Sequence, residues 1–271
     1  MSIHSDKKAI TTTHIRAQKK KTPLVGLTAY TASLAKAMDP HVDLILVGDS
    51  VAMTIYGKDS TLGVSVETMI RHGEAVASSC RYACVVVDLP FGSYQRSPEQ
   101  AFDTASRIMN ETGCAAIKLE GGQEMAPTVE FLSLRGVPVL GHVGLTPQAI
   151  NVLGGFRTQG KDDAAAQRLR ADTISMENAG AFAVVIEGVV ESLAREMTES
   201  VSIPTIGIGA SPACDGQILV IDDVIGLFTA FKPRFVKRYA NVLDVAETAI
   251  AEYAKEVRER QFPTDEHIFK G

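Results

Sequence analysis

The sequence lacks the features that mark several specialised classes of protein. No apolar run approaches the about 20 residues needed to span a bilayer, and no apolar secretory segment stands at the N-terminus of this sequence. The formal net charge of −5 argues against binding that depends on neutralising nucleic-acid phosphates. We therefore expect a cytoplasmic protein with no membrane and no nucleic-acid partner.

Cysteine is also scarce. Four cysteines are present, and the closely spaced Cys80 and Cys84 are followed by no second pair or histidine pair that would complete a zinc site. Cys84 begins an apolar run and Cys114 follows a glycine that ends a predicted helix, so both fit a protein core. We expect reduced thiols, as is typical of a cytoplasmic protein.

What the sequence does contain is a regular alternation of short apolar runs and longer helical patterns. The candidate strands begin near Leu24, Leu44, Val85, Ala116, Val137, Ala183, Thr205 and Ile218. Such alternation is typical of parallel strands joined by right-handed crossovers. Eight units in 271 residues favour an α/β fold, a closed (β/α)8 TIM barrel in one domain over 1–271. The alternative is an open doubly wound sheet, but no Gly-x-Gly-x-x-Gly motif follows the first strand.

The two ends of the chain differ from this central pattern. Residues 1–21 are basic, and we interpret them as an N-terminal arm or a short capping helix. Residues 241–260 form an amphipathic helical pattern that ends before Pro263. This C-terminal helix packs either on its own barrel or on a neighbouring subunit. Within the central pattern, helix N-caps are predicted at Ser65, Ser97 and Asp162 or Asp163.

Four of the apolar runs end on a carboxylate, and small, flexible residues stand nearby. The acids are Asp49, Asp88, Glu120 and Glu187. Parallel strands end at one face of the sheet, where α/β enzymes build their sites, so we expect these acids to converge. Asp49 and Asp88 can hold a hard divalent cation such as Mg²⁺, with Glu120 as a third ligand, directly or through water. The alternative is that each acid caps the next helix, but the predicted helix starts lie well beyond Asp49 and Asp88.

Three further residues could carry chemistry. Lys118 lies two residues before Glu120, on the same side of its strand, where a buried ammonium needs a carboxylate or an anionic ligand. A structural Lys–Glu pair is the alternative. His142 stands between glycines at a strand end and suggests ligand contact, although a lone histidine is more often structural. Glu187, near the cation without binding it, is the candidate general base; a salt-bridged loop acid is the alternative.

Several blocks of sequence resemble the ketopantoate hydroxymethyltransferase family in the family's order. The blocks are 46–50, 88–95, 118–122, 141–148, 154–161 and 206–210, followed by Asp215-Gly216-Gln217. The resemblance extends from about Leu24 to Lys237. Two positions depart from the family pattern: Thr31 stands where Asp is usual, and Ser211 stands where Gly is usual. These departures affect the expected rim of the site and the folate pocket.

The resemblance implies a (β/α)8 barrel of the phosphoenolpyruvate/pyruvate type. It implies transfer of a hydroxymethyl group from 5,10-methylenetetrahydrofolate to 3-methyl-2-oxobutanoate, giving 2-dehydropantoate on the route to pantothenate and coenzyme A. The implied Mg²⁺, one per subunit, is bound by Asp49, Asp88 and Glu120. The implied substrate contacts are Asp49, Ser50, Asp88 and Lys118, to which we add His142. Glu187 is the implied proton acceptor, and the implied assembly is a homodecamer.

These roles together predict a mechanism through a Mg-stabilised enolate. Mg²⁺ chelates the carboxylate and 2-oxo oxygens, Lys118 adds positive charge, and Glu187 removes the C3 proton. One alternative is another metal-dependent 2-oxo-acid lyase or mutase of the same barrel superfamily, disfavoured because no Lys-Lys-Cys-Gly loop is present. Another is a catalytically inactive barrel used as a binding scaffold, disfavoured because the charged residues named above are all present.

Overall fold

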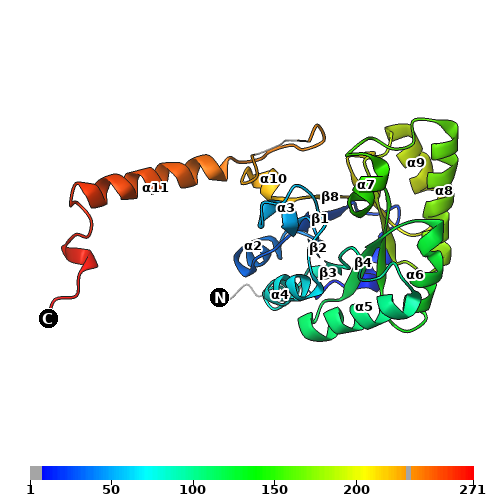
Figure 1. Ribbon diagram of the computed structural model, residues 1–271, viewed down its shortest axis with the longest axis horizontal. Helices are drawn as coiled ribbons and strands as arrows, with labels where there is room; N and C mark the ends of the chain where they lie inside the picture. The colour runs from blue at the N-terminus through cyan, green and yellow to red at the C-terminus, as the bar shows by residue number, and fades with distance from the viewer. Residues whose placement is uncertain (1–7, 230–232) are drawn as a thin grey trace. The chain divides into compact units, whose positions relative to one another are not determined.

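A closed barrel of parallel strands forms the first part of the molecule (Figure 1). The computed structural model describes residues 8–229 and 233–271, so residues 1–7 of the predicted N-terminal arm lie outside it. The described residues group into two compact units that meet in sequence between Val220 and Ile221. The strands of the first unit are β1 Leu24–Thr28, β2 Leu44–Val47, β3 Cys84–Asp88, β4 Ala116–Glu120, β5 Val139–Gly144, β6 Ala183–Glu187, β7 Thr205–Ile208 and β8 Gly216–Leu219. Because β8 pairs with both β7 and β1, the predicted (β/α)8 barrel is confirmed and the open sheet is excluded.

Helices alternate with the strands along the chain. They are α1 Thr12–Arg16, α2 Ala32–Met38, α3 Val51–Thr54, α4 Val66–Ala77, α5 Pro98–Thr112, α6 Ala126–Ser133, α7 Ile150–Leu153, α8 Asp163–Asn178 and α9 Glu191–Ser200, with short 3-10 helices η1 Gln123–Met125 and η2 Pro147–Ala149. Figure 1 shows α4, α5, α6 and α8 on the outside of the strands. Every residue of β2, β3 and β4 is buried, as the continuous apolar runs predict.

Local capping chemistry sets the helix boundaries. A side-chain oxygen accepts a hydrogen bond from the backbone N–H three residues on at each of the predicted N-caps Ser65, Ser97 and Asp162. Gly113 ends α5 with φ 72°, a left-handed conformation that glycine adopts without strain. Ser97 and Gln100 do not form a capping box, in which the Gln100 side chain would accept from the backbone N–H of Ser97. Gln100 Oε1 instead accepts from the backbone N–H of Arg96.

The first residues of the strands pack around α1. Ile15 on α1 is fully buried and belongs to the same core cluster as Leu24, Leu44 and Cys84, which begin β1, β2 and β3. The backbone N–H of Ile10 also donates to the carbonyl of Tyr82, just before β3. The segment around α1 therefore covers the N-terminal ends of the strands, opposite the face where the strand-end acids lie.

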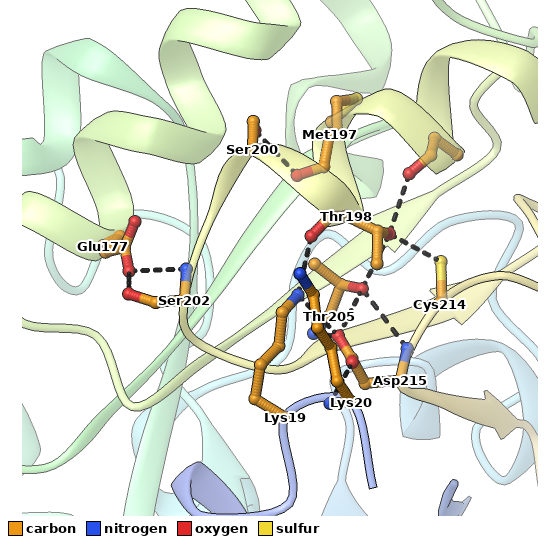
Figure 2. A network of polar contacts seen from close by, with 11 residues as sticks. Lys19, Lys20, Glu177, Met197, Thr198, Ser200, Ser202, Thr205, Cys214 and Asp215 are labelled. Carbon is orange, nitrogen blue, oxygen red and sulfur yellow. Dashed lines mark hydrogen bonds and ion pairs between the residues drawn. The ribbon is translucent and has the colours of Figure 1, made fainter.

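A polar network holds the chain after α1 to the starts of β7 and β8 (Figure 2). Lys19 Nζ lies 2.8 Å from Asp215 Oδ2 and donates to the carbonyl of Thr198 at 2.6 Å. Asp215 also accepts from the backbone N–H groups of Lys20 and Thr205, both at 2.9 Å. Asp215 is part of a block that resembles the family, and its contacts here are those of a structural anchor.

The second unit contains α10 Ile221–Ile225, α11 Val242–Arg258 and η3 Asp265–His267. A helix is thus present within the predicted range 241–260. None of the described α11 residues is buried, and Val245 and Ile250 are 70% and 66% exposed.

The whole chain's four cysteines are free. In the part of the chain that is described, helices long and apolar enough to cross a bilayer are absent.

Candidate active site

Strands β2 to β6 bring the predicted polar residues together at their carboxyl ends. Asp49 follows β2, Asp88 ends β3 and Glu120 ends β4, and the parallel register sets Asp88 beside Lys118 and Glu120 beside His142. These five residues are at most 6% exposed. Glu187, at the end of β6, is the more accessible member, with its side chain 16% exposed. The predicted convergence at one face of the barrel is observed.

Lys118 is the cation of this cluster. Its Nζ lies 3.1 Å from Asp88 Oδ1 and 3.1 Å from His142 Nδ1. Burial opposes the charged form, but the negative charges of Asp88 and Glu120 outweigh it and raise the pKa of Lys118. The predicted pairing with an acid is confirmed, and the ion-pair partner is Asp88 on the neighbouring strand, not Glu120 on the same strand.

His142 lies between Lys118 and Glu187. Because an ammonium can only donate, Nδ1 of His142 accepts from Lys118 and the ring proton is assigned to Nε2. Nε2 lies 3.2 Å from Glu187 Oε2. Burial and the charge of Lys118 lower the pKa of His142, which favours the neutral ring. A chain of contacts therefore runs from Asp88 through Lys118 and His142 to Glu187.

One oxygen of each buried acid accepts a hydrogen bond from the protein. Asp88 Oδ2 accepts from the backbone N–H of Asp49 at 2.9 Å. Asp49 Oδ2 accepts from Gln148 Nε2, and Glu120 Oε2 accepts from the backbone N–H of Gln148, both at 2.9 Å. The other oxygens of Asp88 and Glu120 face cluster members: Asp88 Oδ1 lies beside Lys118, and Glu120 Oε1 lies 3.7 Å from His142 Nδ1.

Negative charge exceeds positive charge in the cluster. Burial and the charge of Asp88 raise the pKa of Asp49 to about 7. Burial, together with the charge of Asp49, also raises the pKa of Glu120 well above its usual range, although Lys118 opposes this. Four carboxyl groups at these strand ends face one ammonium, so either protonation of Asp49 and Glu120 or a further cation would relieve the repulsion between them.

A preformed metal site is not part of this arrangement. Within residues 8–229 and 233–271, no three histidine, cysteine or carboxylate side chains are arranged to hold a metal ion. The acids are engaged with Lys118 and Gln148 instead. The donor chemistry nevertheless fits a hard divalent cation, because the donors are carboxylate oxygens and the three buried acids Asp49, Asp88 and Glu120 meet at neighbouring strand ends.

The loop after Asp49 differs from the sequence prediction. A long loop was expected, but α3 begins at Val51, with Ser50 as its N-cap residue. Asp49 still does not cap a helix, because its side chain accepts from Gln148. Ser50 Oγ lies 2.7 Å from the hydroxyl of Tyr30, which holds the predicted substrate contact beside the acids.

Two buried residues of the cluster were missed by sequence reasoning. Tyr94 and Gln148 are 1% and 5% exposed, and the hydroxyl of Tyr94 lies 2.7 Å from Gln148 Oε1. Both stand inside blocks that resemble the family, and that was the only sequence signal for them. Neither has a periodicity or spacing of its own that points to a site.

The two departures from the family pattern make contacts away from the acids. Thr31 is the N-cap of α2, and its hydroxyl accepts from the backbone N–H of Leu34. Ser211 is buried, and its hydroxyl donates to Glu191 at 2.7 Å. Both substitutions are therefore accommodated by local hydrogen bonds.

Comparison with known proteins gives one family. The model of the ketopantoate hydroxymethyltransferase family matches residues 9–265. A 3-methyl-2-oxobutanoate hydroxymethyltransferase of Ruegeria sp. (strain TM1040) is 60% identical over 269 residues, covering 99% of this chain and 96% of the relative.

Similar solved structures share the fold at low identity. One is a phosphonopyruvate hydrolase in complex with oxalate and Mg²⁺, with a TM-score of 0.60, 13% identity and coverage of 96% of this chain and 92% of that one. Another is 2,3-dimethylmalate lyase, a member of the PEP mutase/isocitrate lyase superfamily, with a TM-score of 0.58, 16% identity and coverage of 97% and 89%. These likenesses agree with the barrel described above.

Proposed function

The chain belongs to the ketopantoate hydroxymethyltransferase family, and from this premise we propose how its strand-end cluster carries out the reaction. The chain is a transferase that adds a hydroxymethyl group to 3-methyl-2-oxobutanoate, a step of the pantothenate pathway. The observation that carries the proposal is the chain of contacts from Asp88 through Lys118 and His142 to Glu187. In this chain the ammonium of Lys118 lies beside Asp88, and Glu187, a partly exposed carboxylate, lies at the far end.

Lys118 and Ser50 are the proposed contacts of the 2-oxo acid. Lys118 is the buried cation of the cluster, so it attracts the substrate carboxylate and the negative charge that develops on the 2-oxo oxygen. The hydroxyl of Ser50, held by Tyr30, is a further polar group next to Asp49. His142 lies between Lys118 and the proposed base, and we retain it as a substrate contact.

Glu187 is the proposed base for the C3 proton of the substrate. Its side chain is the most accessible carboxylate of the cluster, and His142 Nε2 lies 3.2 Å from one of its oxygens. A carboxylate that is partly exposed can reach the substrate proton while the other acids of the cluster stay buried. The proton moves to a Glu187 oxygen, the electron pair of the C–H bond forms a double bond between C3 and C2, and the π pair of the 2-oxo group moves onto its oxygen, where Lys118 stabilises the charge.

Asp49, Asp88 and Glu120 are the proposed ligands of one Mg²⁺ per subunit. Support comes from their oxygen donors and from the four acidic side chains that surround a single ammonium group. The phosphonopyruvate hydrolase of the same fold is described with oxalate and Mg²⁺. When bound, the cation supplies Lewis-acid polarisation of the 2-oxo acid oxygens.

The proposed one-carbon donor is 5,10-methylenetetrahydrofolate. The decisive experiment is incubation of the purified chain with 3-methyl-2-oxobutanoate and this donor, with Mg²⁺ or with EDTA. We expect 2-dehydropantoate to form with Mg²⁺ and to fall below detection with EDTA. Product formation that is equally fast in EDTA contradicts the metal role, and no product with either addition contradicts the choice of donor.

We also propose a cytoplasmic location and a homo-oligomer, with a decamer as the expected size. The free cysteines suit a reducing compartment. The exposed Val245 and Ile250 of α11 are typical of a helix that a second copy covers. Sedimentation of the purified chain tests the assembly, since a monomer at micromolar concentration contradicts it.

A further inference from the structure

Gln148 makes a full set of hydrogen bonds inside the cluster. Its Nε2 donates to Asp49 Oδ2 and to the carbonyl of Leu89, both at 2.9 Å. Its Oε1 accepts from the hydroxyl of Tyr94 at 2.7 Å and from Gln95 Nε2 at 3.1 Å. Both protons and both lone pairs of the amide are thus used, which is costly to rearrange in a buried place.

The orientation of this amide is fixed by its partners. The carbonyl of Leu89 can only accept, so the atom facing it must be the NH₂ group. The same NH₂ group is therefore the one that faces Asp49. The opposite arrangement would set the amide oxygen of Gln148 against the carbonyl and the carboxylate, and both contacts would be repulsive.

Gln148 also reaches a second acid through its backbone. Its N–H donates to Glu120 Oε2 at 2.9 Å, while its side chain holds Asp49. Gln148 lies in η2, in the segment after β5, so a single residue ties Asp49 after β2 and Glu120 at the end of β4 to a third part of the barrel. Tyr94 strengthens the link, because its hydroxyl accepts from the backbone N–H of Glu120 at 3.1 Å.

We propose that Gln148 is the positioning residue of the divalent-cation site. The proposal rests on the metal role of Asp49 and Glu120 proposed above. By engaging Oδ2 of Asp49 and Oε2 of Glu120, Gln148 fixes the rotation of both carboxylates. A bound cation would then meet Asp49 Oδ1 and Glu120 Oε1, the second of which lies 3.7 Å from His142 Nδ1. Replacing a residue that hydrogen-bonds a metal ligand, without itself binding the metal, commonly weakens metal affinity by about 10–100-fold.

Cation binding without substrate tests this role separately from turnover. Mn²⁺ is the probe, and electron paramagnetic resonance measures its free concentration during titration of the full-length chain. Gln148→Met removes both side-chain donors at similar volume and keeps the backbone N–H. We expect the dissociation constant for Mn²⁺ to rise by about 10–100-fold. Gln148→Asn keeps an amide, which protects the fold, but is too short to reach Asp49, and it should weaken binding in the same direction.

Gln100→Met is the matched control. Gln100 also donates and accepts one hydrogen bond each with backbone groups, but it touches none of the acids. The Gln100→Met variant should bind Mn²⁺ with unchanged affinity, even if the midpoint of its thermal unfolding, measured in EDTA, is lower than that of the unsubstituted chain. If either folded Gln148 variant binds Mn²⁺ as tightly as the unsubstituted chain, the positioning role is wrong while the metal role stands. If the unsubstituted chain binds no Mn²⁺, the metal role and the inference both fail.

Discussion

The Nζ atom of Lys118 lies 3.1 Å from Nδ1 of His142, and this contact determines which nitrogen of the histidine carries the proton. An ammonium has no lone pair, so Nδ1 must be the acceptor and Nε2 the protonated atom. The protonated nitrogen is the one near Glu187. The tautomer of the histidine next to the proposed base is therefore set by Lys118.

The first prediction concerns this tautomer. In ¹⁵N-labelled protein at neutral pH, long-range ¹H–¹⁵N spectra should show His142 as the Nε2-protonated form. In Lys118→Met, where the ammonium is gone, the preference should weaken and the Nδ1-protonated form should appear. A ring protonated on Nδ1 in the unsubstituted chain would contradict the assignment.

The second prediction concerns the base. Glu187→Gln removes the proton acceptor but keeps the size of the side chain. Exchange of the substrate C3 proton with solvent deuterium, followed by NMR, should slow by about 10²–10⁴-fold, while 3-methyl-2-oxobutanoate still binds. Glu177→Gln is the control, because Glu177 bonds Ser202 outside the cluster (Figure 2) and should leave exchange unchanged. Normal exchange in Glu187→Gln removes Glu187 as the base.

The third prediction concerns metal removal. Asp49→Asn combined with Asp88→Asn withdraws two of the proposed charged ligands without changing side-chain volume. Calorimetric binding of 3-methyl-2-oxobutanoate should depend on Mg²⁺ in the unsubstituted chain and be undetectable in the double variant. Binding of the oxo acid that is equally tight in EDTA would show that these acids bind no metal needed for substrate binding.

The fourth prediction tests a close approach between β5 and β6. Gly144 has φ +98°, and a Cβ atom added there would lie 2.3 Å from the carbonyl oxygen of Glu187. Gly144→Ala should cost about 2–5 kcal/mol in urea unfolding, from backbone strain plus overpacking, and should displace the base. Gly136→Ala is the control: φ is +82° there but space is open, so only a backbone cost of about 1–2 kcal/mol is expected. Equal costs at both positions would contradict the steric argument.

The fifth prediction concerns pH and the anchor beneath the barrel. Burial would raise the pKa of Asp215, but hydrogen bonds from Lys19 and from backbone N–H groups outweigh burial and lower it. A carboxyl whose pKa is lower in the folded state stabilises the fold above its unfolded pKa of about 3.9. That stabilisation is lost as pH falls through the folded pKa.

Asp215→Asn measures this contribution. The variant should lose about 3 kcal/mol of unfolding free energy at pH 7, because Lys19 loses its charged partner. The loss should shrink as the pH of the urea titrations falls below 4. Asp265→Asn, which breaks a largely exposed pair at 3.8 Å with Lys270, should change stability by less than about 0.5 kcal/mol. A pH-independent loss in Asp215→Asn would show that its charge is not the cause.

The strands, the helix caps at Ser65, Ser97 and Asp162, and the positions of the acids could be predicted from the sequence. Apolar runs such as 44–47 and 84–88 are local patterns, and a serine or aspartate that caps a helix acts on backbone groups three residues away. The same local logic placed Asp49, Asp88 and Glu120 at strand ends, which meet because parallel strands share a direction. Their roles as metal ligands stay a prediction.

The sequence by itself determined which charged residues reach the carboxyl-end face of the barrel, because strand ends are encoded locally. Tertiary structure decided which of them touch. Lys118 pairs with Asp88 because the register of β3 and β4 sets these residues side by side. Gln148 holds Asp49 across 99 residues of sequence, a contact that only closure of the barrel creates. Such pairings depend on how distant strands align and not on any pattern within one segment.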